Sequence, residues 1–511
     1  MANIPPLSYA VLTPASIALG LLCSVCLYWI IWTLYSLFFH PLSAYPGPKL
    51  WALTRLPWIW TSLRGDIAWT IRDFHEQYGP VIRIAPDELS YTTGTAGKKI
   101  YGQRSPEFVK CLDGRGIVPP SRMGVRGIVT AHQEKHAQLR RAILPAFSER
   151  ALREQESFFQ LYAGKLTAQL SRVCKSGPQD MVRWYSFTTF DIVSDLAFGE
   201  AAGCLGRSIH RSFPLSLDNA DSPWLAVLGL RAKSIVWLQF TVYYGLYHWI
   251  AWIAPKYMLQ ARQKHIELCG EKIRRRLQLK EDRKDFMSYI LDNKSEKLSN
   301  LELVIMASAF IVAGSRTSAA ALSGMTFLLL RNPPVYRRLV DEIRSAFQKE
   351  EDMTMVATGQ LRYLGAVIEE GLRLYPPSPS SLPRFVPGKG EEIDGKWVPG
   401  GIAVGVHQLS AGSMEWNFQQ AKSFIPERWL DVSADSPFAN DNRTSIQPFS
   451  YGPRNCIGKS MAYAEMRLIL AHILWKFDLE LVDKSDTWST TQKTYLVWEK
   501  PPLMINIRER E

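Results

Sequence analysis

The stretch FSYGPRNCIGKS, from Phe449 to Ser460, places a single cysteine among glycine, proline and arginine residues. An isolated cysteine is often a small buried hydrophobe, and that reading of Cys456 stays open when the residue is taken alone. Gly452 and Gly458 permit a tight turn and close approach of the backbone, and Arg454 adds a fixed cation for a carboxylate. These neighbours favour a reactive thiolate at Cys456.

The residues around and after the loop indicate which metal that thiolate would bind. Met461 to Trp475 reads MAYAEMRLILAHILW, which predicts an apolar helix whose N-terminal dipole favours a negatively charged sulfur. One thiolate is a sufficient protein ligand for haem iron. Zinc takes several Cys or His ligands, and no CxxC or HxxxH pattern lies near Cys456. The stretch therefore favours haem over zinc.

Five of these residues match the pattern of a known family. Phe449, Gly452, Arg454, Cys456 and Gly458 agree with F-x-x-G-x-R-x-C-x-G, so the stretch resembles the haem-binding signature of the cytochrome P450 monooxygenases. Other segments agree in the family's order, and the resemblance extends from the N-terminal apolar run onward. It implies a mainly α fold with a minor β portion, haem (iron protoporphyrin IX) as the cofactor and Cys456 as the iron ligand.

A second pattern lies in EEGLRLYPP, where Glu370 and Arg373 match the family's E-x-x-R. A spacing of three places both side chains on one helix face, as in an ordinary surface ion pair. The apolar setting LGAVIEEGLRL instead indicates burial, where an unpaired partner would be costly. The resemblance adds Arg428, in FIPERWL, as the third member of a structural network that supports the haem.

The resemblance also implies cations for the two haem propionates. His136 and Arg140, in KHAQLRRAI, resemble the family's W-x-x-x-R, with histidine in place of tryptophan. Arg140 is expected to meet one propionate, and Arg384, in LPRFVP, reaches them from the other side. Arg454 would make a third such contact. Taken singly, each arginine would read as a surface residue.

A predicted helix from Leu301 to Leu330 contains AGSRTS, which resembles the family's oxygen-binding motif. Ala313 and Gly314 are small and would leave room for O2, while Thr317 would hydrogen-bond the oxygen and help deliver protons. As a plain helix residue, Thr317 would bond a carbonyl one turn back. Arg316 departs from the motif, which has an acid there, because arginine keeps its proton and cannot relay one.

The N-terminal run predicts the topology, since no lysine, arginine or carboxylate precedes Lys49. Ala15 to Phe39 exceeds the roughly 20 apolar residues that span a bilayer. A cleaved signal peptide is the alternative, but the run is too long and lacks a basic start. Aromatic residues gather toward the end of the run, and the cations Lys49 and Arg55 follow it. This order predicts a lumenal N-terminus and a cytoplasmic catalytic domain at the endoplasmic reticulum.

The predicted organisation is therefore an anchor at 1–40, a proline-rich hinge at 41–50 and a catalytic domain at 51–511. Within that domain helical spacing dominates, for example at Glu149 to Ser171, and β patterns are few. The β patterns lie at Val81 to Tyr91, Gly390 to Val406 and Lys493 to Ile507.

A second uncharged run, Ser234 to Ala254, is long enough to span a membrane, but aromatic residues dominate it throughout. We expect it to lie in the membrane interface, with spanning as the alternative. By analogy with the family, substrate recognition would involve this run and the segments Val109 to Ile128, Ser378 to Leu382 and Ser489 to Thr494.

The net charge of +12 fits an acidic partner. The densest basic run, KIRRR at Lys272 to Arg276, lacks the aromatic interleaving typical of a single-strand binder, so we read it as a solvated helix face and expect no nucleic-acid partner. Seven scattered cysteines argue against a disulfide framework and fit a domain that faces the cytosol.

These patterns predict a membrane-anchored haem-thiolate monooxygenase that inserts one oxygen atom from O2 by hydroxylation or epoxidation. The resemblance implies a membrane-bound NADPH-cytochrome reductase as electron donor. FIPERWL and VWEKPPL resemble fungal enzymes of secondary metabolism, which implies a lipophilic terpenoid or polyketide-like substrate. An isomerase or dehydratase of the same fold, working without a reductase, remains the alternative because of Arg316. A haem protein that only binds or scaffolds is a third possibility.

Overall fold

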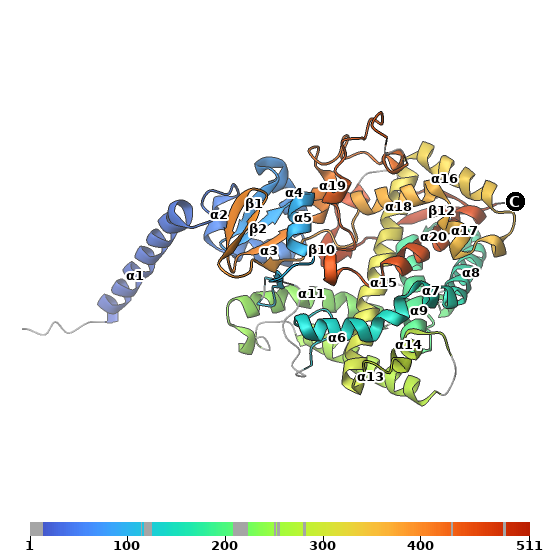
Figure 1. Cartoon of the computed structure of the whole chain (residues 1–511), viewed down its shortest axis with the longest axis horizontal. Helices are drawn as coiled ribbons and strands as arrows, with labels where there is room; N and C mark the ends of the chain where they lie inside the picture. Colours follow the sequence, from blue (N-terminus) through green and yellow to red (C-terminus); the bar gives the residue numbers. More distant parts are fainter. Residues whose placement is uncertain are drawn as a thin grey trace, which may run out of the picture.

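The computed structural model describes residues 14–113, 115–116, 125–207, 223–249, 252, 256–279, 283–430, 433–483 and 487–510. A helix-rich body carries a smaller β-rich lobe on one side, and the helix α1 (Pro14–Leu34) projects away from that lobe (Figure 1). The expected mainly α fold with a minor β portion is confirmed.

The β-rich lobe is built on a five-stranded sheet of order β1-β2-β8-β5-β3. It brings distant segments together, since Lys110 of β3 pairs with Arg384 of β5. Short helices pack around this sheet. The strands are β1 (Val81–Ala85), β2 (Glu88–Tyr91), β3 (Val109–Lys110), β5 (Arg384–Phe385) and β8 (Ala403–Val406), and the helices are α2 (Lys49–Leu53), α3 (Leu56–Arg64), α4 (Ile67–Tyr78) and α5 (Gly94–Tyr101).

Three smaller sheets, β4-β12-β9, β10-β11 and β6-β7, complete the β structure of the described residues. The three predicted β segments are therefore confirmed. The last of them is interrupted at Pro501 and Pro502, which have no amide donors for a ladder. The strands are β4 (Gln179–Asp180), β6 (Gly390–Ile393), β7 (Lys396–Pro399), β9 (Phe477–Leu481), β10 (Lys493–Tyr495), β11 (Val497–Glu499) and β12 (Met504–Glu509).

The helix predicted at Glu149 to Ser171 is interrupted at Gln155, whose buried side chain donates to the carbonyl of Ala146. The helices of the body are α6 (Gln133–Ile143), α7 (Glu149–Glu154), α8 (Glu156–Val173), α9 (Met181–Phe198), α10 (Cys204–Arg207), α11 (Pro223–Tyr243), α13 (Lys256–Gln278), α14 (Phe286–Asp292), α15 (Asn300–Arg331), α16 (Pro333–Ala346), α17 (Met355–Gly359), α18 (Arg362–Leu374), α19 (Gln408–Ser413), α20 (Lys459–Lys476) and α21 (Thr487–Thr490).

Helix α15 crosses the middle of the body (Figure 1). Ser299 and Glu302 start it with a reciprocal capping box. It is apolar and long enough to span a membrane. However, more than half of its most apolar stretch is buried inside the protein, so it is a core helix. It packs closely against α9, where a Cβ on Gly314 would come within 2.9 Å of Val193.

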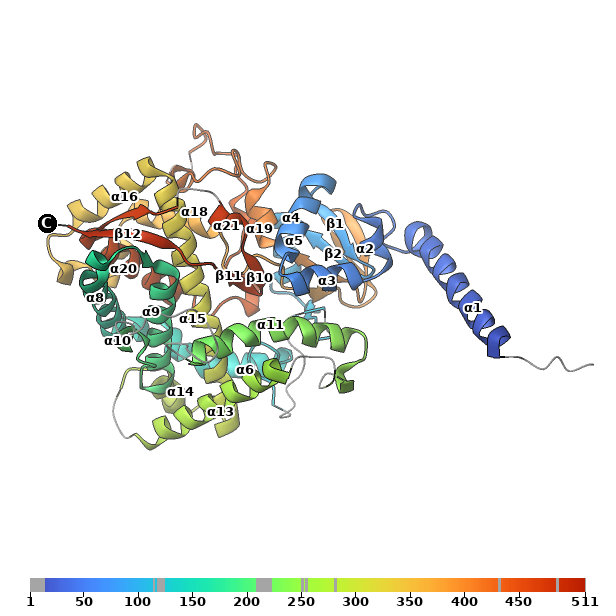
Figure 2. The same ribbon diagram turned by 180° about the vertical axis from the view of Figure 1, so that it is seen from behind.

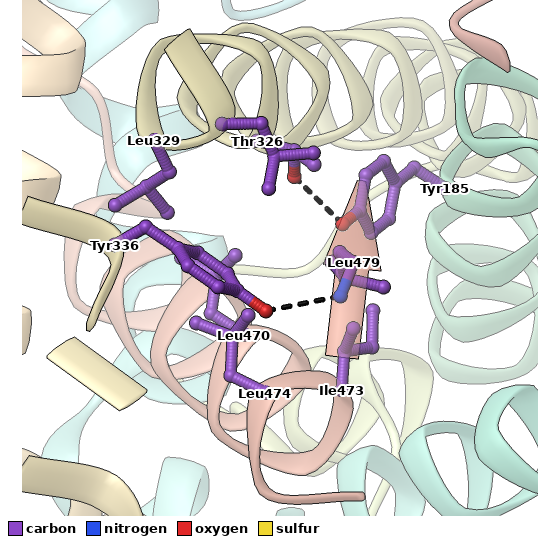
Figure 3. Close-up of a pocket in the computed structure, with 9 residues that line it drawn as sticks. Tyr185, Thr326, Leu329, Tyr336, Leu470, Ile473, Leu474 and Leu479 are labelled. Atoms are coloured by element: carbon purple, nitrogen blue, oxygen red, sulfur yellow. Dashed lines mark hydrogen bonds between the residues drawn. The ribbon is translucent and has the colours of Figure 1, made fainter. Parts of the chain in front are cut away.

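A small apolar gap lies where α9, α15, α16, α20 and β9 meet (Figure 3). Its polar groups are paired: the hydroxyls of Tyr185 and Thr326 lie 2.8 Å apart, and the amide of Leu479 donates to the hydroxyl of Tyr336 over 3.0 Å. The remaining lining is leucine and isoleucine. This gap belongs to the core packing, and its described lining residues offer no unpaired polar group that would bind a ligand.

The N-terminal helix is a candidate membrane span, continuous from Pro14 to Phe39 through a π-helical turn, with no buried residue in α1. Its last turns contact the β-rich lobe. Trp32 Nε1 donates to the carbonyl of Leu53 over 2.8 Å, and Arg83 Nη1 donates to that of Ser36 over 2.9 Å. These bonds attach the end of the span to the body.

The basic run Lys272–Arg276 lies on α13, and its reading as a solvated face is wrong for Arg276. That side chain is buried and donates to Asp285 over 2.8 Å. Lys272, one turn earlier on the same face, reaches Glu200 over 2.7 Å. The ion-pair partners, Glu200 and Asp285, lie outside the run, so the charge pattern of the run alone did not reveal them.

Candidate functional site

The Cys456 loop is closed by its own backbone. The amide of Cys456 donates to the carbonyl of Phe449 over 2.8 Å. Gly452 has a φ of +71°, and a Cβ there would lie 2.1 Å from the carbonyl oxygen of Tyr101, so only glycine fits. Gly458 has a negative φ, and the nearest atom to a Cβ would be 3.9 Å away, so the protein by itself does not require glycine there.

The Cys456 thiol is accessible to solvent although protein surrounds the loop. Burial raises its pKa, whereas the amide of Gly458 and the cations Arg140 and Lys459 act to lower it. Arg140 is held at this side of the loop, because it donates to the Asn455 carbonyl over 2.9 Å and to its Oδ1 over 2.6 Å. These hydrogen bonds hold Arg140 against Asn455, the residue directly before Cys456.

The AGSRTS motif lies on helix α15, where one side of the helix is accessible and the other is packed against α9. Ala313 is exposed, whereas its neighbours in the middle of the helix are buried or half-buried, and Thr317, one turn later, is half-buried. Thr317 Oγ1 donates to the carbonyl of Ala313 over 2.6 Å. Gly314 and Ser315 belong to the packed side: Gly314 lies against Val193, and the Ser315 hydroxyl is buried and donates to its own helix. The small size of Gly314 is thus explained by helix packing.

A cluster of cations lies between the Cys456 loop and the β-rich lobe. Arg454 and Arg384 both approach Glu107, and Arg384 is almost fully buried, with no hydrogen-bond partner for its Nε and Nη1 atoms. Burial, with Arg384 and Arg454, lowers the pKa of Lys110 to about 7. Burial and the same cations lower the pKa of His136 to about 3, which keeps it neutral. A cavity of about 490 Å³ adjoins the cluster, lined in part by Arg454 and His136.

Lys110 was not singled out from the sequence. It is brought to this cluster because β3 pairs with β5, and its ammonium also donates to the carbonyl of Val129 over 2.8 Å. The one available signal in the sequence was that Lys110 is a basic residue within Val109 to Ile128, a segment expected to recognise substrate.

Glu370, Arg373 and Arg428 form one buried network, each with a fully buried side chain. Arg373 donates to both carboxylate oxygens of Glu370, over 2.8 and 2.7 Å, and Arg428 donates to Glu370 over 3.2 Å. Burial acts to raise the pKa of Glu370, but the two guanidinium groups outweigh it and hold the pKa below its ordinary value.

Two further residues complete the network and were missed from the sequence. Asp441 accepts from Arg428, and Trp429 Nε1 donates to Glu370 over 2.9 Å. The other donors of Arg373 are satisfied by main-chain carbonyls, including that of Ser423 at 2.9 Å. Trp429 could have been suspected from the sequence because it directly follows Arg428 in FIPERWL. No pattern near Asp441 indicates that it belongs to the network.

The segments expected to recognise substrate come together in part. Gln239 of α11 donates to the carbonyl of Gly116 over 2.7 Å, and α11 also contacts β10, which begins within Ser489 to Thr494. Trp249 and Trp252 are strongly exposed, at 60% and 87%. Some residues of Val109 to Ile128 and of Ser234 to Ala254 lie outside the described residues.

The residues fit a haem group. An accessible thiol offers one soft ligand for iron, and Ala313 exposes a small side chain on the central helix. Arg384 has guanidinium nitrogens without hydrogen-bond partners, and it lies near Arg454 and Lys110. Glu107 is the acid that these cations share, so the cluster has donors left to bind two propionates. No group of three His, Cys, Asp or Glu side chains within the described part of the chain could hold a different metal.

Comparison with known proteins gives a consistent result. The sequence model of the family "Cytochrome P450" matches residues 45–507. "Cytochrome P450 monooxygenase alt3" of Alternaria solani is 55% identical over 492 residues, which cover 96% of this chain and 94% of that protein. "Averantin hydroxylase" of Dothistroma septosporum is 41% identical over 491 residues, covering 94% and 90%. "Cytochrome P450 monooxygenase stcF" of Emericella nidulans is 41% identical over 484 residues, covering 93% and 96%.

Proposed function

Because this chain belongs to the cytochrome P450 family, we propose that it is a membrane-anchored haem-thiolate monooxygenase that hydroxylates or epoxidises a lipophilic secondary metabolite. The family makes it an enzyme that uses haem iron, O2 and NADPH-derived electrons. The relative named for averantin hydroxylation supports hydroxylation, and the proposed substrate is terpenoid or polyketide-like. The accessible Cys456 thiol, held in the family's loop, carries the proposal.

Cys456 would hold the iron, and Arg140, Arg384 and Arg454 would hold the propionates. When bound, haem iron activates O2 by reduction. Thr317 would hold a proton at Oγ1 beside the reacting oxygen, and Ala313 would leave room there. The contacts of Arg140 with Asn455 support a role on the sulfur side, where it favours the thiolate.

The apolar helix to Phe39 supports anchoring in the endoplasmic reticulum membrane, with the catalytic domain in the cytoplasm. We assign electron delivery to a membrane-bound NADPH-cytochrome reductase. The positive net charge, and the exposed Lys459 close to Cys456, favour an acidic partner surface on this side.

Coexpression with a reductase, in a host fed with candidate terpenoid and polyketide intermediates, tests the function. A monooxygenase consumes O2 and NADPH in proportion to an oxygenated product. An isomerase or dehydratase would form product without O2 uptake, and that result would overturn the proposal.

Replacing Thr317 with alanine is expected to uncouple the reaction, because the hydroxyl that would deliver protons is lost. Product formed per NADPH should fall by about 10²-fold, the lower end of what a positioned proton donor contributes, and peroxide release should rise. Thr317→Ser is the matched control, since it keeps the hydroxyl and should retain most coupling. Undiminished coupling in Thr317→Ala would remove this residue from the mechanism.

Removing residues 1–31 is expected to leave the haem spectrum intact, because the bonds of Trp32 and Ser36 to the body are kept. Removing 1–40 instead takes away Ser36, which accepts from the buried Arg83, so a lower unfolding temperature is expected. Thermal denaturation of the two truncations measures this difference. Equal stability would show that these bonds contribute nothing.

Both truncations should still bind membranes weakly through the exposed Trp249 and Trp252. Replacing both tryptophans with serine in the 1–31 truncation should release the protein from sedimenting vesicles. A haem-loaded truncation that is fully soluble with both tryptophans present would contradict the interfacial contact.

A further inference from the structure

A chain of aromatic rings joins the central helix to the surface of the β-rich lobe. Tyr375, which follows α18, stacks on Trp498 of β11, with ring centroids 5.2 Å apart and ring planes inclined by 25°. The ring of Trp498 in turn lies 5.0 Å from that of Trp69 in α4. Such separations are those of rings in direct contact. Tyr375 and Trp498 are buried, whereas Trp69 is half-buried, so the chain runs from the core to the surface.

The inner end of this chain lies on the side of α15 that carries Thr317. A Cβ on Gly324 would collide with the ring of Tyr375, and Ala320 belongs to the same buried cluster as Tyr375 and Trp498. Thr317, Ala320 and Gly324 are three and four residues apart, so they share one helix face. With a rise of about 1.5 Å per residue, Gly324 lies roughly 10 Å along the helix from Thr317. The β10–β11 hairpin lies between α15 and the lobe that carries α4 (Figure 2).

The two indole groups are placed so that each can lose an electron without losing a proton. Trp498 Nε1 donates to the carbonyl of Pro376 over 2.8 Å. Trp69 Nε1 donates to the carbonyl of Gln492, also over 2.8 Å. A carbonyl oxygen stabilises positive charge on the indole, but it is too weak a base to remove the proton. Electrons can therefore pass between the two rings without a proton acceptor.

Neighbouring groups determine which rings can hold the positive charge. The Tyr375 hydroxyl donates to the side-chain carbonyl of Gln492, and burial raises the pKa of this phenol well above its ordinary value. Tyr375 therefore keeps its proton and connects α15 to the indoles without being oxidised itself. The guanidinium of Arg72 lies 4.8 Å from the Trp69 ring, but its charge is offset by an ion pair with Asp73 over 2.7 Å.

We propose that Trp498 and Trp69 form a protective electron-transfer chain, which passes electrons from the protein surface to the haem site when no substrate is bound. The proposal rests on the proposed monooxygenase function, because that function supplies the oxidant. Trp498 gives one electron to the oxidant, and Trp69 then reduces Trp498. A thiol or ascorbate in solution is the reductant that restores Trp69. Two such passes, with two protons from solvent, convert the oxygen atom of the oxidant into water.

The test uses the full-length holoenzyme without substrate and supplies the oxidising equivalents as a peracid, 3-chloroperoxybenzoic acid. Freeze-quenched wild-type protein should give the electron paramagnetic resonance signal of an oxidised indole. Trp498→Phe should abolish this signal, because phenylalanine keeps an aromatic ring in place but is much harder to oxidise. The signal is a property of the protein's own side chains and does not depend on turnover.

Bleaching of the haem at a fixed ascorbate concentration gives the second measurement. An oxidant that is not reduced damages the haem and nearby side chains. Trp498→Phe and Trp69→Phe should therefore each bleach several-fold faster than the wild type. Trp475→Phe is the matched control and should bleach at the wild-type rate. Its indole also donates to a main-chain carbonyl, that of Phe347 over 3.0 Å, but it is not part of the chain.

A wild type without an indole signal, or equal bleaching rates in the wild type and both chain variants, would overturn the proposal. If Trp498→Phe fails to fold, the bleaching rate of Trp69→Phe decides, since Trp69 is only half-buried. Failure of the monooxygenase function gives a different result. An indole signal with peracid, but no O2-dependent product with a reductase, would refute that function and support the chain. A protein that binds no haem would refute both.

Discussion

Replacing Cys456 with serine is expected to abolish the absorbance that marks thiolate-ligated haem in the reduced carbon monoxide complex. A serine hydroxyl keeps its proton and is a much weaker iron ligand than a thiolate. In the native protein the Gly458 amide, Arg140 and Lys459 favour the anionic sulfur and oppose the effect of burial. Coordination to a metal completes the deprotonation. The variant should lose the thiolate band altogether.

Cys174→Ser provides the matched control. Cys174 is half-buried, and its one hydrogen bond within the described residues is to the carbonyl of Ser171, over 3.3 Å, so its replacement should leave the spectrum unchanged. Absorbance of the carbon monoxide complex in both variants gives the readout. A native spectrum in Cys456→Ser would refute both the assigned iron ligand and the haem-thiolate function of this loop.

Replacing Glu370 with alanine is expected to produce the largest loss of stability. The substitution leaves Arg373 and Arg428 buried without the carboxylate that they share. Breaking a buried ion pair from one side costs about 3–5 kcal/mol, because the remaining charge stays desolvated. Thermal denaturation should show a much lower unfolding temperature, and haem should be lost during purification.

The neighbouring Glu369 offers a control on the same helix. Its carboxylate is partly exposed and accepts one described hydrogen bond, from the hydroxyl of Tyr463 over 2.7 Å. Glu369→Ala removes the same charge without leaving a buried cation, so its effect should be smaller and haem should be retained. Equal unfolding temperatures for the two variants would show that the network around Glu370 contributes nothing special.

Several features were predictable because each is a local pattern. The apolar run that ends at Phe39 is recognisable by its length and lack of charge. Spacing of three residues is enough to place Glu370 and Arg373 on one helix face. The loop around Cys456 shows its glycines and cation within a few positions. Local geometry of this kind follows from backbone periodicity, whatever the rest of the chain does.

Only the tertiary structure decided which distant groups meet these residues. Asp441 joins the Glu370 network, and Lys110 reaches Arg384 through the pairing of β3 with β5. Arg316 turns toward α11, where its guanidinium donates to the carbonyl of Leu228. Periodicity determines the face of a helix on which a residue lies, but the partner across that face depends on how the helices and strands pack. The charge that a buried group meets is therefore set by long-range packing, which no local pattern encodes.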